Sequence, residues 1–533
     1  MRATLRAWRE RGVVPVAGAV ASGVLTAAAF APLEWSDTAW CGLVPLILAC
    51  AYVTPRQAVR LGWIAGFTFW LCSIFWLTRV TFAGWLLLSA YCALYTVPLA
   101  VVVSWWFGRF GAGRFLPNAA FLLGGTAVWT FSEYARFTLF TGFPWNPLGV
   151  SQATNLAFIQ HAVWGGVYAV GALVAVANMA IAVTVLRYLR GHARFGRTPH
   201  IELLLAMSLI LVAFVTGTRL YRAVVVVGDE LRVAVVQPAI PQEEKWSVES
   251  EEMIYTRLRD LTLQAVEWTQ PDLVVWPETA LPVDVRLSEG WYELVDRLAR
   301  LGTPILVGSM DSETLMDGQP RYYNSSFLFA TNGMIVGEYD KNHLVLFGEY
   351  VPLHEYVDIV NALTPVMESF SPGDTNTVFE LPGRGTPFSA LICFEDSLPY
   401  LARRSVRNGA RLLINQTNDA WFDPSAASRQ HQLLAVFRAV ENRVPMVRSA
   451  NTGYSCHIEA TGRIRETLVS EGGRHDGAGF LLVPVVVPPA AMPLTWYTRH
   501  GDVFAWVCGV VALPFLVPAF AAVRRRRRDE VGA

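Results

Sequence analysis

Long apolar runs alternate with short polar stretches from residue 13 to residue 219, and one more apolar run lies near the C-terminus. An α-helix needs about 20 consecutive apolar residues to cross a bilayer. The runs that approach this length cover residues 13–32, 38–54, 61–78, 84–107, 118–135, 163–187, 202–219 and 503–523. The pattern predicts about eight transmembrane helices, seven before a polar region and one after it.

Basic residues in the short loops indicate the orientation of these helices, because Lys and Arg gather on the cytoplasmic side. With the N-terminus inside, the loops and the tail on that side carry Arg56, Arg60, Arg109, Arg114, Arg187, Arg190, Arg194, Arg197 and Arg524–Arg528. This predicts a multi-pass protein of the cell (inner) membrane whose polar region faces the periplasm or another extracytoplasmic space. The first apolar run could instead be a signal peptide, but its length favours a retained helix.

Residues 228–500 follow a different pattern, in which short apolar strands alternate with amphipathic helices. Strands are predicted near 231–236, 273–276, 304–308, 323–330, 334–340, 388–393, 411–416, 446–450, 455–459 and 479–487, and helices near 251–268, 290–301, 398–408 and 429–442. Continuous apolar strands are typical of sheets buried on both faces, so we expect packed sheets covered by helices. The chain then divides into a membrane domain (1–227), an α/β domain (228–500) and a last transmembrane helix with a basic tail (501–533).

The amino-acid composition indicates a membrane protein and gives no sign of nucleic acid binding. Hydrophobic residues make up 53% of the 533 residues, which is high for a soluble enzyme. The 43 basic and 43 acidic residues balance, so bulk charge gives no reason to expect nucleic acid binding. Of the seven cysteines, Cys393 and Cys456 lie in the polar region, and no metal-site spacing occurs. A disulfide between these two is one alternative to a reactive thiol.

Three predicted strands end in residues that could do chemistry together: Glu278, Lys341 and Cys393. A thiol with a pKa near 8.5 is mostly protonated at neutral pH, so a nucleophilic cysteine needs a nearby base or cation. The glutamate could accept the proton of the thiol, and the lysine could stabilise both a thiolate and an oxyanion. Taken singly, each residue has an ordinary explanation, as an inert buried cysteine, a capping acid or an exposed lysine.

The segments around these three residues resemble the nitrilase superfamily. They read VVWPETALP around Glu278, YDKNHLVLFGEYVP around Lys341 and ALICFED around Cys393, and the match continues through INQTNDAWF, RAVENR and RSANTGYS. The apolar runs, the segment VQPAIPQEEKW that ends at Trp246 and a GFPW loop extend the likeness over nearly the whole chain. Taken together, they resemble the membrane-embedded branch of the superfamily, the apolipoprotein N-acyltransferase family.

This resemblance implies a fold, a reaction and a catalytic triad. The fold is a multi-pass helical membrane domain joined to a four-layer α-β-β-α sandwich. The reaction transfers a fatty acyl chain from a membrane phospholipid to the N-terminal diacylglyceryl-cysteine amine of an apolipoprotein, without a cofactor or metal, and we expect a monomer. In the triad, Glu278 is the base, Lys341 stabilises the oxyanion and Cys393 accepts the acyl group as a thioester.

The same resemblance places supporting residues near the site. Glu349 would position the lysine or hydrogen-bond around the thiol, and Glu395 would support the site. Trp246 and Phe394 would contact substrate, although Phe394 stands where a tyrosine is also familiar. For Glu395 and Trp246, a purely structural role is an equal alternative.

Two other segments are candidates for contact with lipid. Residues 136–152 contain helix-breaking Gly and Pro with Trp145 between them, and form either an interfacial connector or a surface that holds lipid. Glu133 and Arg136, at the start of this loop, are expected to neutralise each other. Residues 353–372 are apolar, rich in proline and poor in charge, and form either a lid that dips into lipid or an ordinary packing segment.

Other functions use parts of the same pattern. A membrane-tethered amidase or nitrile hydrolase would use the same triad and let water attack, but about eight transmembrane helices are hard to explain for a polar substrate. A transporter is disfavoured because the apolar runs hold few central ionisable residues. A non-catalytic lipid-binding scaffold requires that the triad does not converge.

Overall fold

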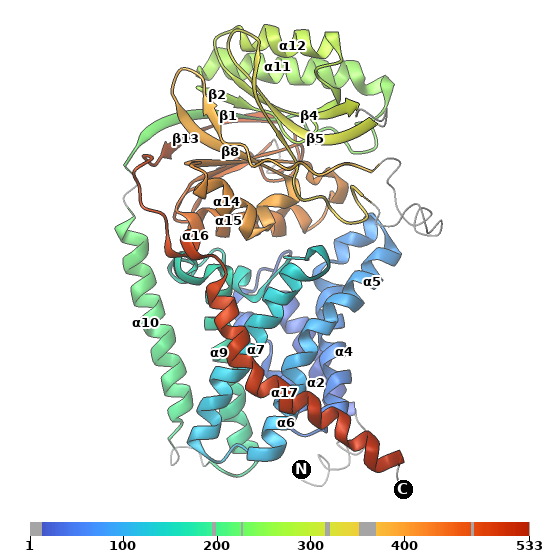
Figure 1. The fold of residues 1–533 in the computed structure, drawn as a ribbon, viewed down its shortest axis with the longest axis vertical. Helices are drawn as coiled ribbons and strands as arrows, with labels where there is room; N and C mark the ends of the chain where they lie inside the picture. Colours follow the sequence, from blue (N-terminus) through green and yellow to red (C-terminus); the bar gives the residue numbers. More distant parts are fainter. Residues whose placement is uncertain are drawn as a thin grey trace. The chain divides into compact units, whose positions relative to one another are not determined.

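The computed structural model describes residues 13–193, 199–224, 227–314, 320–350, 369–470 and 474–531. The chain forms two compact units (Figure 1). One unit, called the membrane unit below, comprises residues 1–78, 82–221 and 500–533; the other, called the sandwich unit, comprises residues 79–81 and 222–499.

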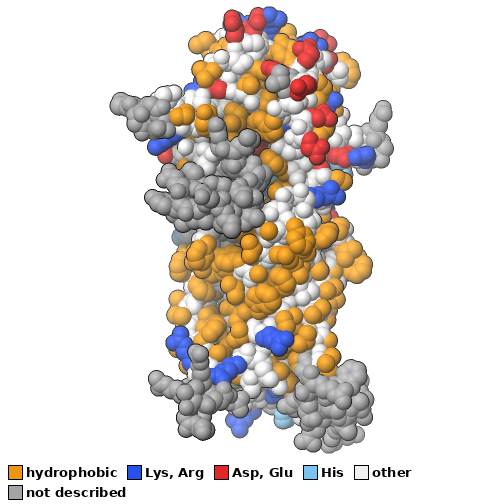
Figure 2. Space-filling model, turned by 90° about the vertical axis from the view of Figure 1, so that its right-hand side faces the viewer, with side chains coloured by type: hydrophobic (Ala, Val, Ile, Leu, Met, Phe, Trp, Pro, Cys, Tyr) orange, Lys and Arg blue, Asp and Glu red, His pale blue; other side chains and the backbone are white. Residues whose placement is uncertain are grey.

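The membrane unit is helical in its described part. Its main helices are α2 (Val13–Ala28), α3 (Val44–Cys50), α4 (Pro55–Ser73), α5 (Phe82–Ala93), α6 (Val97–Phe110), α7 (Phe115–Thr138), α9 (Ala162–Leu189), α10 (Ile201–Ala223) and α17 (Val503–Val531). Helical segments long and apolar enough to cross a membrane are Phe82–Phe110, Ala162–Leu189, Ile201–Ala223 and Val503–Arg524. Hydrophobic side chains cover a broad band over these helices (Figure 2). Several apolar helices are therefore confirmed, and the count of eight spans stays a prediction.

One apolar run does not form a continuous helix. Residues 38–54 fold into a 3₁₀ turn, Ser36–Trp40, and the seven-residue helix α3, with Pro45 in its first turn. Thr54 then caps the next helix, accepting a hydrogen bond from the Gln57 backbone N–H, and Pro55 opens that helix. Proline is well placed at the start of a helix but lacks the N–H that would continue one from the preceding turn. At 1.5 Å per residue, α3 is too short to cross a bilayer by itself.

Contacts join the basic ends of several helices within the membrane unit. Arg190, after α9, donates to the carbonyl oxygens of Ala51 at 2.7 Å and Phe107 at 3.1 Å. Arg56, at the start of α4, donates to the carbonyl oxygen of Val523 at 3.1 Å. Loops that the charge pattern assigned to one side of the membrane therefore lie at the same end of the helical bundle.

The loop that contains Trp145 is held by two charged side chains of α7. Arg136 donates to the carbonyl oxygens of Phe143 and Trp145, the second at 2.8 Å. Glu133 accepts from the backbone N–H of Leu148 at 2.7 Å. We expected these two charges to neutralise each other, which stays a prediction; the structure shows that each is hydrogen-bonded to the loop backbone. Trp145 itself is buried in the membrane unit.

The sandwich unit contains two sheets in its described residues. One has the order β13-β1-β2-β4-β5-β6, with β3 paired to β4, and the other has the order β12-β11-β10-β9-β8-β7. The strands are β1 (Asp229–Gln237), β2 (Leu273–Val275), β3 (Leu281–Asp284), β4 (Ile305–Thr314), β5 (Pro320–Phe329), β6 (Ile335–Asp340), β7 (Phe379–Leu381), β8 (Thr386–Ile392), β9 (Leu412–Thr417), β10 (Met446–Ala450), β11 (Cys456–Ile458), β12 (Ile464–Thr467) and β13 (Gly479–Val487).

Two hydrophobic cores arrange these sheets in layers (Figure 1). One core joins the facing sheets through side chains such as Val235, Val275, Ile392 and Ile414. The other packs the outer face of the first sheet against α11 (Glu251–Thr269) and α12 (Glu289–Ala299). The second sheet is covered by α14 (Pro399–Arg407) and α15 (Ala427–Asn442). The predicted packed sheets covered by helices are confirmed as an α-β-β-α sandwich, and β3, β7 and β12 are strands that we did not predict, each three or four residues long.

Candidate active site

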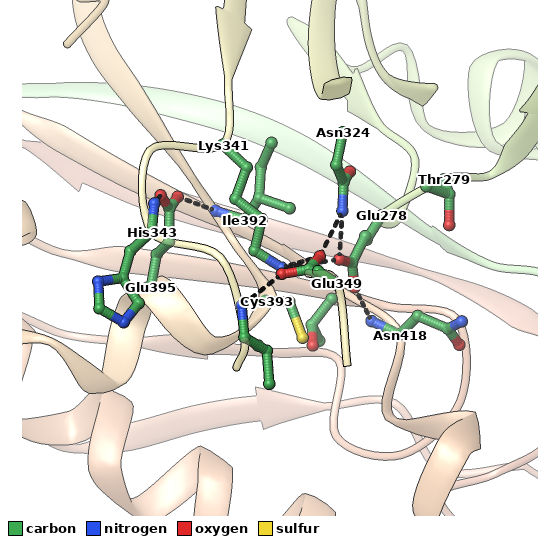
Figure 3. A network of polar contacts seen from close by, with 12 residues as sticks. Glu278, Thr279, Asn324, Lys341, His343, Glu349, Ile392, Cys393, Glu395 and Asn418 are labelled. Carbon is green, nitrogen blue, oxygen red and sulfur yellow. Dashed lines mark hydrogen bonds and ion pairs between the residues drawn. The ribbon is translucent and has the colours of Figure 1, made fainter. Parts of the chain in front are cut away.

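Glu278, Lys341 and Cys393 meet where strands of both sheets end. Glu278 lies just beyond β2 and Lys341 follows β6, both in the first sheet, whereas Cys393 follows β8 in the second. The Lys341 ammonium lies 3.3 Å from a carboxylate oxygen of Glu278. Figure 3 shows the side chains of all three residues converging. The three strand ends that the sequence singled out therefore form one site.

Three donors hold the carboxylate of Glu278. Besides the lysine, the Asn324 side chain donates to one oxygen at 2.8 Å and the backbone N–H of Asn418 donates to the other at 2.9 Å (Figure 3). The residue is 7% exposed. These contacts hold the Glu278 side chain in one orientation.

Lys341 is almost fully buried between two carboxylates. Its ammonium donates to Glu349 at 2.7 Å as well as to Glu278. Burial by itself would lower the pKa of the lysine, but the charges of Glu349 and Glu278 raise it above the usual lysine value. Glu349 is fixed in turn by Asn324 at 3.2 Å and by the backbone N–H of Val345 at 2.8 Å. The lysine therefore remains a cation at neutral pH.

Cys393 sits at a strained turn directly after β8. Its φ angle is +51°, a left-handed conformation that side chains other than glycine rarely adopt. Burial and then the charge of Glu278 raise the pKa of its thiol well above the usual value, while the charge of Lys341 lowers it. The resting thiol is therefore protonated, and it lies near the Glu278 side chain (Figure 3). Strain of this kind is common where a side chain is aimed at a reacting group.

Glu395 ties the ends of β6 and β8 together. Its carboxylate accepts hydrogen bonds from the backbone N–H groups of Asn342 and Ile392, both at 2.8 Å, and of His343 at 3.0 Å. Tyr339 donates to it as well, at 2.9 Å. Burial raises the pKa of Glu395 to about 7. This geometry shows a side chain that shapes the turn around the thiol.

The predicted substrate contacts differ in how they are placed. Phe394 stacks on the His343 ring, with ring centroids 6.0 Å apart. Trp246 is 50% exposed and lies beside the buried Lys245. Trp145 belongs to the membrane unit, which is a separate compact body. Most of the candidate lid, residues 353–372, lies outside the described residues.

The alternative of a disulfide is not realised. Cys393 and Cys456 are both free thiols. Cys456 is buried in β11, where Gln432 donates to its sulfur at 3.2 Å. Only the first of the two therefore stands in the site with a base and a cation.

Comparison with known proteins addresses the identity of the chain. The family model described as apolipoprotein N-acyltransferase N-terminal domain matches residues 22–180, and the model described as carbon-nitrogen hydrolase matches residues 232–473. An apolipoprotein N-acyltransferase of Geobacter metallireducens is 37% identical over 530 residues, which cover 95% of both chains. The chain belongs to the apolipoprotein N-acyltransferase family. The family inferred from the sequence motifs is thereby confirmed.

Other similar proteins span either the whole chain or one part of it. An apolipoprotein N-acyltransferase of Chlorobaculum tepidum is 30% identical over 513 residues, or 92% of both chains. The crystal structure of Saccharomyces cerevisiae Nit3, a member of branch 10 of the nitrilase superfamily, is 20% identical, with a TM-score of 0.37, and covers 50% of this chain and 93% of that chain. With its apolar helices, this member of the apolipoprotein N-acyltransferase family is a membrane protein.

Sequence reasoning missed several polar residues of this N-acyltransferase family member. Asn324, in β5, bridges the carboxylates of Glu278 and Glu349, but nothing in its sequence context marks it. Asn418 and Arg448 lie inside motifs that we used for the family resemblance, without a role being assigned to either. For these two, the position just beyond or within a buried strand was the available signal.

A buried cluster of charges lies behind the thiol-bearing turn. His431 contacts Asp396 through Nε2 at 2.7 Å and Asp419 through Nδ1 at 2.9 Å, and Arg448 pairs with both acids. Asp396 belongs to the turn that begins at Cys393. Burial by itself would lower the pKa of His431, but the two carboxylates raise it to about 9. The cluster therefore fixes this turn with a charged imidazolium.

We predict that His431→Gln destabilises the fold in a pH-dependent manner. A folded-state pKa of about 9, against 6.5 for an ordinary histidine, gives stability that is full below pH 6.5 and is lost as pH rises through 9. The difference in unfolding free energy between wild type and variant should reach about 3 kcal/mol at pH 6 and shrink strongly by pH 10. Denaturant unfolding in detergent at both pH values measures it. A difference independent of pH would contradict the charged state of the imidazole.

Proposed function

We propose that this chain transfers a fatty acyl group from a membrane phospholipid to the N-terminal amine of a diacylglyceryl-cysteine apolipoprotein, through a thioester on Cys393. The observation that supports it most strongly is a protonated thiol at a strand end, beside the Glu278–Lys341 pair, in a membrane protein of the apolipoprotein N-acyltransferase family. No cofactor is needed for this chemistry, since both half-reactions exchange one acyl bond for another.

In the first half-reaction, the thiol is acylated. Glu278 takes the proton of Cys393 as the sulfur attacks the ester carbonyl of the phospholipid. Lys341 and a backbone N–H beside the cysteine stabilise the oxyanion of the tetrahedral intermediate. When the ester C–O bond breaks, the proton passes from Glu278 to the departing oxygen, and a lysophospholipid leaves.

In the second half-reaction, the α-amine of the lipoprotein attacks the thioester. Glu278 accepts a proton from the attacking nitrogen and returns it to the sulfur as the C–S bond breaks. The products are an N-acylated lipoprotein and the free thiol, ready for another cycle. Phe394 and Trp246 are proposed to contact the substrates here, and Trp145 to contact lipid in the membrane unit.

The number of transmembrane helices, the membrane and the orientation of the protein are part of the same proposal. The apolar runs favour eight transmembrane helices, and the loop charges favour an inner-membrane protein with its sandwich unit on the periplasmic face. The chain would act as a monomer. Both substrates carry acyl chains, so a membrane-embedded enzyme would meet them where they reside.

The main alternative is a hydrolase with the same site, in which water discharges the thioester. Purified protein incubated with phospholipid vesicles and a diacylglyceryl-cysteine peptide should yield a peptide heavier by one acyl group, detected by mass spectrometry. Release of free fatty acid with unchanged peptide would instead support the membrane-tethered amidase or hydrolase. A water-excluding site is what the acyltransferase requires, because a waiting thioester is open to hydrolysis.

A further inference from the structure

Lys245 is a second buried lysine at the site, and the proposed chemistry does not use it. It is 3% exposed, although it lies between the exposed residues Glu244 and Trp246. Its ammonium donates to the backbone carbonyl of Glu278 at 3.1 Å and to the Thr279 hydroxyl at 2.7 Å. A lysine is rarely buried unless it is paired, so this placement requires an explanation.

The two acceptors belong to a strained turn that carries the base. Thr279 has a φ angle of +42°, in the left-handed region. The turn is also crowded, because a side chain at Gly308 in β4 would lie 2.2 Å from the carbonyl oxygen of Pro277. A strained conformation persists only where surrounding contacts enforce it. The ammonium of Lys245 supplies two such contacts on either side of the bond that links Glu278 to Thr279.

The segment that carries Lys245 is fastened to the same site at other points. Asn451 donates to the carbonyl oxygen of Ile240 and accepts from its N–H, at 2.8 and 3.0 Å. Asn418, whose backbone N–H binds the Glu278 carboxylate, donates through its side chain to Gln242 at 2.8 Å. Residues 240–246 therefore contact Asn418, a partner of Glu278, and Asn451, which donates to Asn418. Within this segment Lys245 is buried and Trp246 is exposed.

The charge of Lys245 also acts on the reacting groups. Burial lowers its pKa to about 8, against the opposing effect of Glu278, which follows β2, and of Cys393, which follows β8. Glu243 and Glu244 on its own segment are exposed. A nearby cation favours both a carboxylate and a thiolate. As pH rises through about 8, this cation loses its charge, whereas Lys341 retains its own.

We propose that Lys245 is a positioning residue for acyl transfer, whose ammonium fixes the Glu278–Thr279 turn and places a second positive charge near Glu278 and Cys393. This inference rests on the proposed function, because it assigns Glu278 as the base. The proposed active site then contains two cations. Lys341 stabilises the oxyanion, and Lys245 supports the turn that carries the base, Glu278. The buried Lys245 also fixes the position of the backbone next to Trp246.

The test measures how fast Cys393 is acylated at different pH values. Full-length protein in detergent is mixed with vesicles of phosphatidylethanolamine and phosphatidylglycerol, and the acyl adduct is followed by intact-protein mass spectrometry from pH 5 to pH 10. Lys245→Met should acylate about 10-fold to 100-fold more slowly at pH 7, and the rising acid limb should move up by about one pH unit. The wild-type rate should fall above pH 8, where Lys245 loses its charge, and this fall should be absent in Lys245→Met.

Three further variants separate charge from structure. Thr279→Val removes one acceptor and keeps the cation, so it should lower the rate without moving the acid limb. Glu244→Gln, at the exposed residue next to Lys245, should change neither the acylation rate nor the position of the acid limb. Lys245→Gln keeps a hydrogen-bond donor without the charge and should show the same shift as Lys245→Met, which keeps the test decisive if the methionine variant unfolds.

The outcomes distinguish this inference from the function on which it rests. If wild type forms no adduct at Cys393, the proposed function fails, and the inference fails with it. If wild type forms the adduct and the Lys245 variants keep the wild-type acid limb, Lys245 is only a structural residue and the inference alone is overturned.

Discussion

Cys393→Ala is expected to abolish N-acyl transfer, with a loss of about 10³-fold or more in product formation, because it removes the sulfur that holds the acyl group between the two proposed half-reactions. The variant should still fold. The thiol accounts for one small side chain at a turn that Glu395 and the Asp396 cluster hold independently. Mass spectrometry of the diacylglyceryl-cysteine peptide after incubation with vesicles gives the product yield.

Cys456→Ala is the matched control for this variant. Both cysteines are free, and both lie in the second sheet or directly after one of its strands. The sulfur of Cys456 has Gln432 as its hydrogen-bond donor and lies on β11, away from the three strand ends that form the site. This variant should retain most of the activity. Equal losses in both variants would mean that the assay reports damage to the sandwich rather than loss of the nucleophile.

The second large effect is expected for Glu278→Gln. An amide of nearly the same shape cannot take the thiol proton, so acylation should fall by about 10² to 10⁴. Lys341, Asn324 and the Asn418 backbone N–H all donate to the carboxylate oxygens of Glu278. In the glutamine variant, the amide NH₂ group would face at least one of these donors, so a favourable hydrogen bond would be replaced by a contact between two donors. The rate of adduct formation at Cys393, measured at pH 7, checks the prediction.

Glu349→Gln provides the comparison within the site. Glu349 contacts Lys341 and Asn324, and the family resemblance implies a supporting role for it, so its replacement should cost less than that of Glu278. Both variants remove one carboxylate from the same lysine. A larger loss for Glu349→Gln would identify it as the base and would require the proton path to be redrawn.

Much of the site could be predicted because a simple pattern marks it. An apolar run that stops at one polar or reactive residue delivers that residue to the edge of a sheet, and Glu278 and Cys393 follow this pattern. Lys341 directly follows β6, whose sequence IVGEYD already holds two acids, so its position at a strand end was the signal. The sequence could not show that β2 and β6 belong to one sheet and β8 to the other. That meeting depends on contacts between facing sheets, which no local pattern records.

The residues that escaped prediction are those whose role depends on distant partners. Asn324 lies in the middle of β5, and its amide meets the carboxylates of Glu278 and Glu349 only in the folded protein. Lys245 lies among charged residues and looks solvated in the sequence, yet it is buried beneath a turn more than 30 residues away. The break at α3 was hidden for a different reason, since composition reports hydrophobicity and not whether a helix is continuous.

The measurement that tests the central claim most directly is the intact mass of wild-type protein after incubation with phospholipid vesicles, followed by addition of a diacylglyceryl-cysteine peptide. We predict a mass increase of one acyl group, located on Cys393 by peptide mapping, that disappears as the N-acylated peptide forms. An adduct on another residue, or N-acylated peptide formed at full rate by Cys393→Ala, would contradict the account.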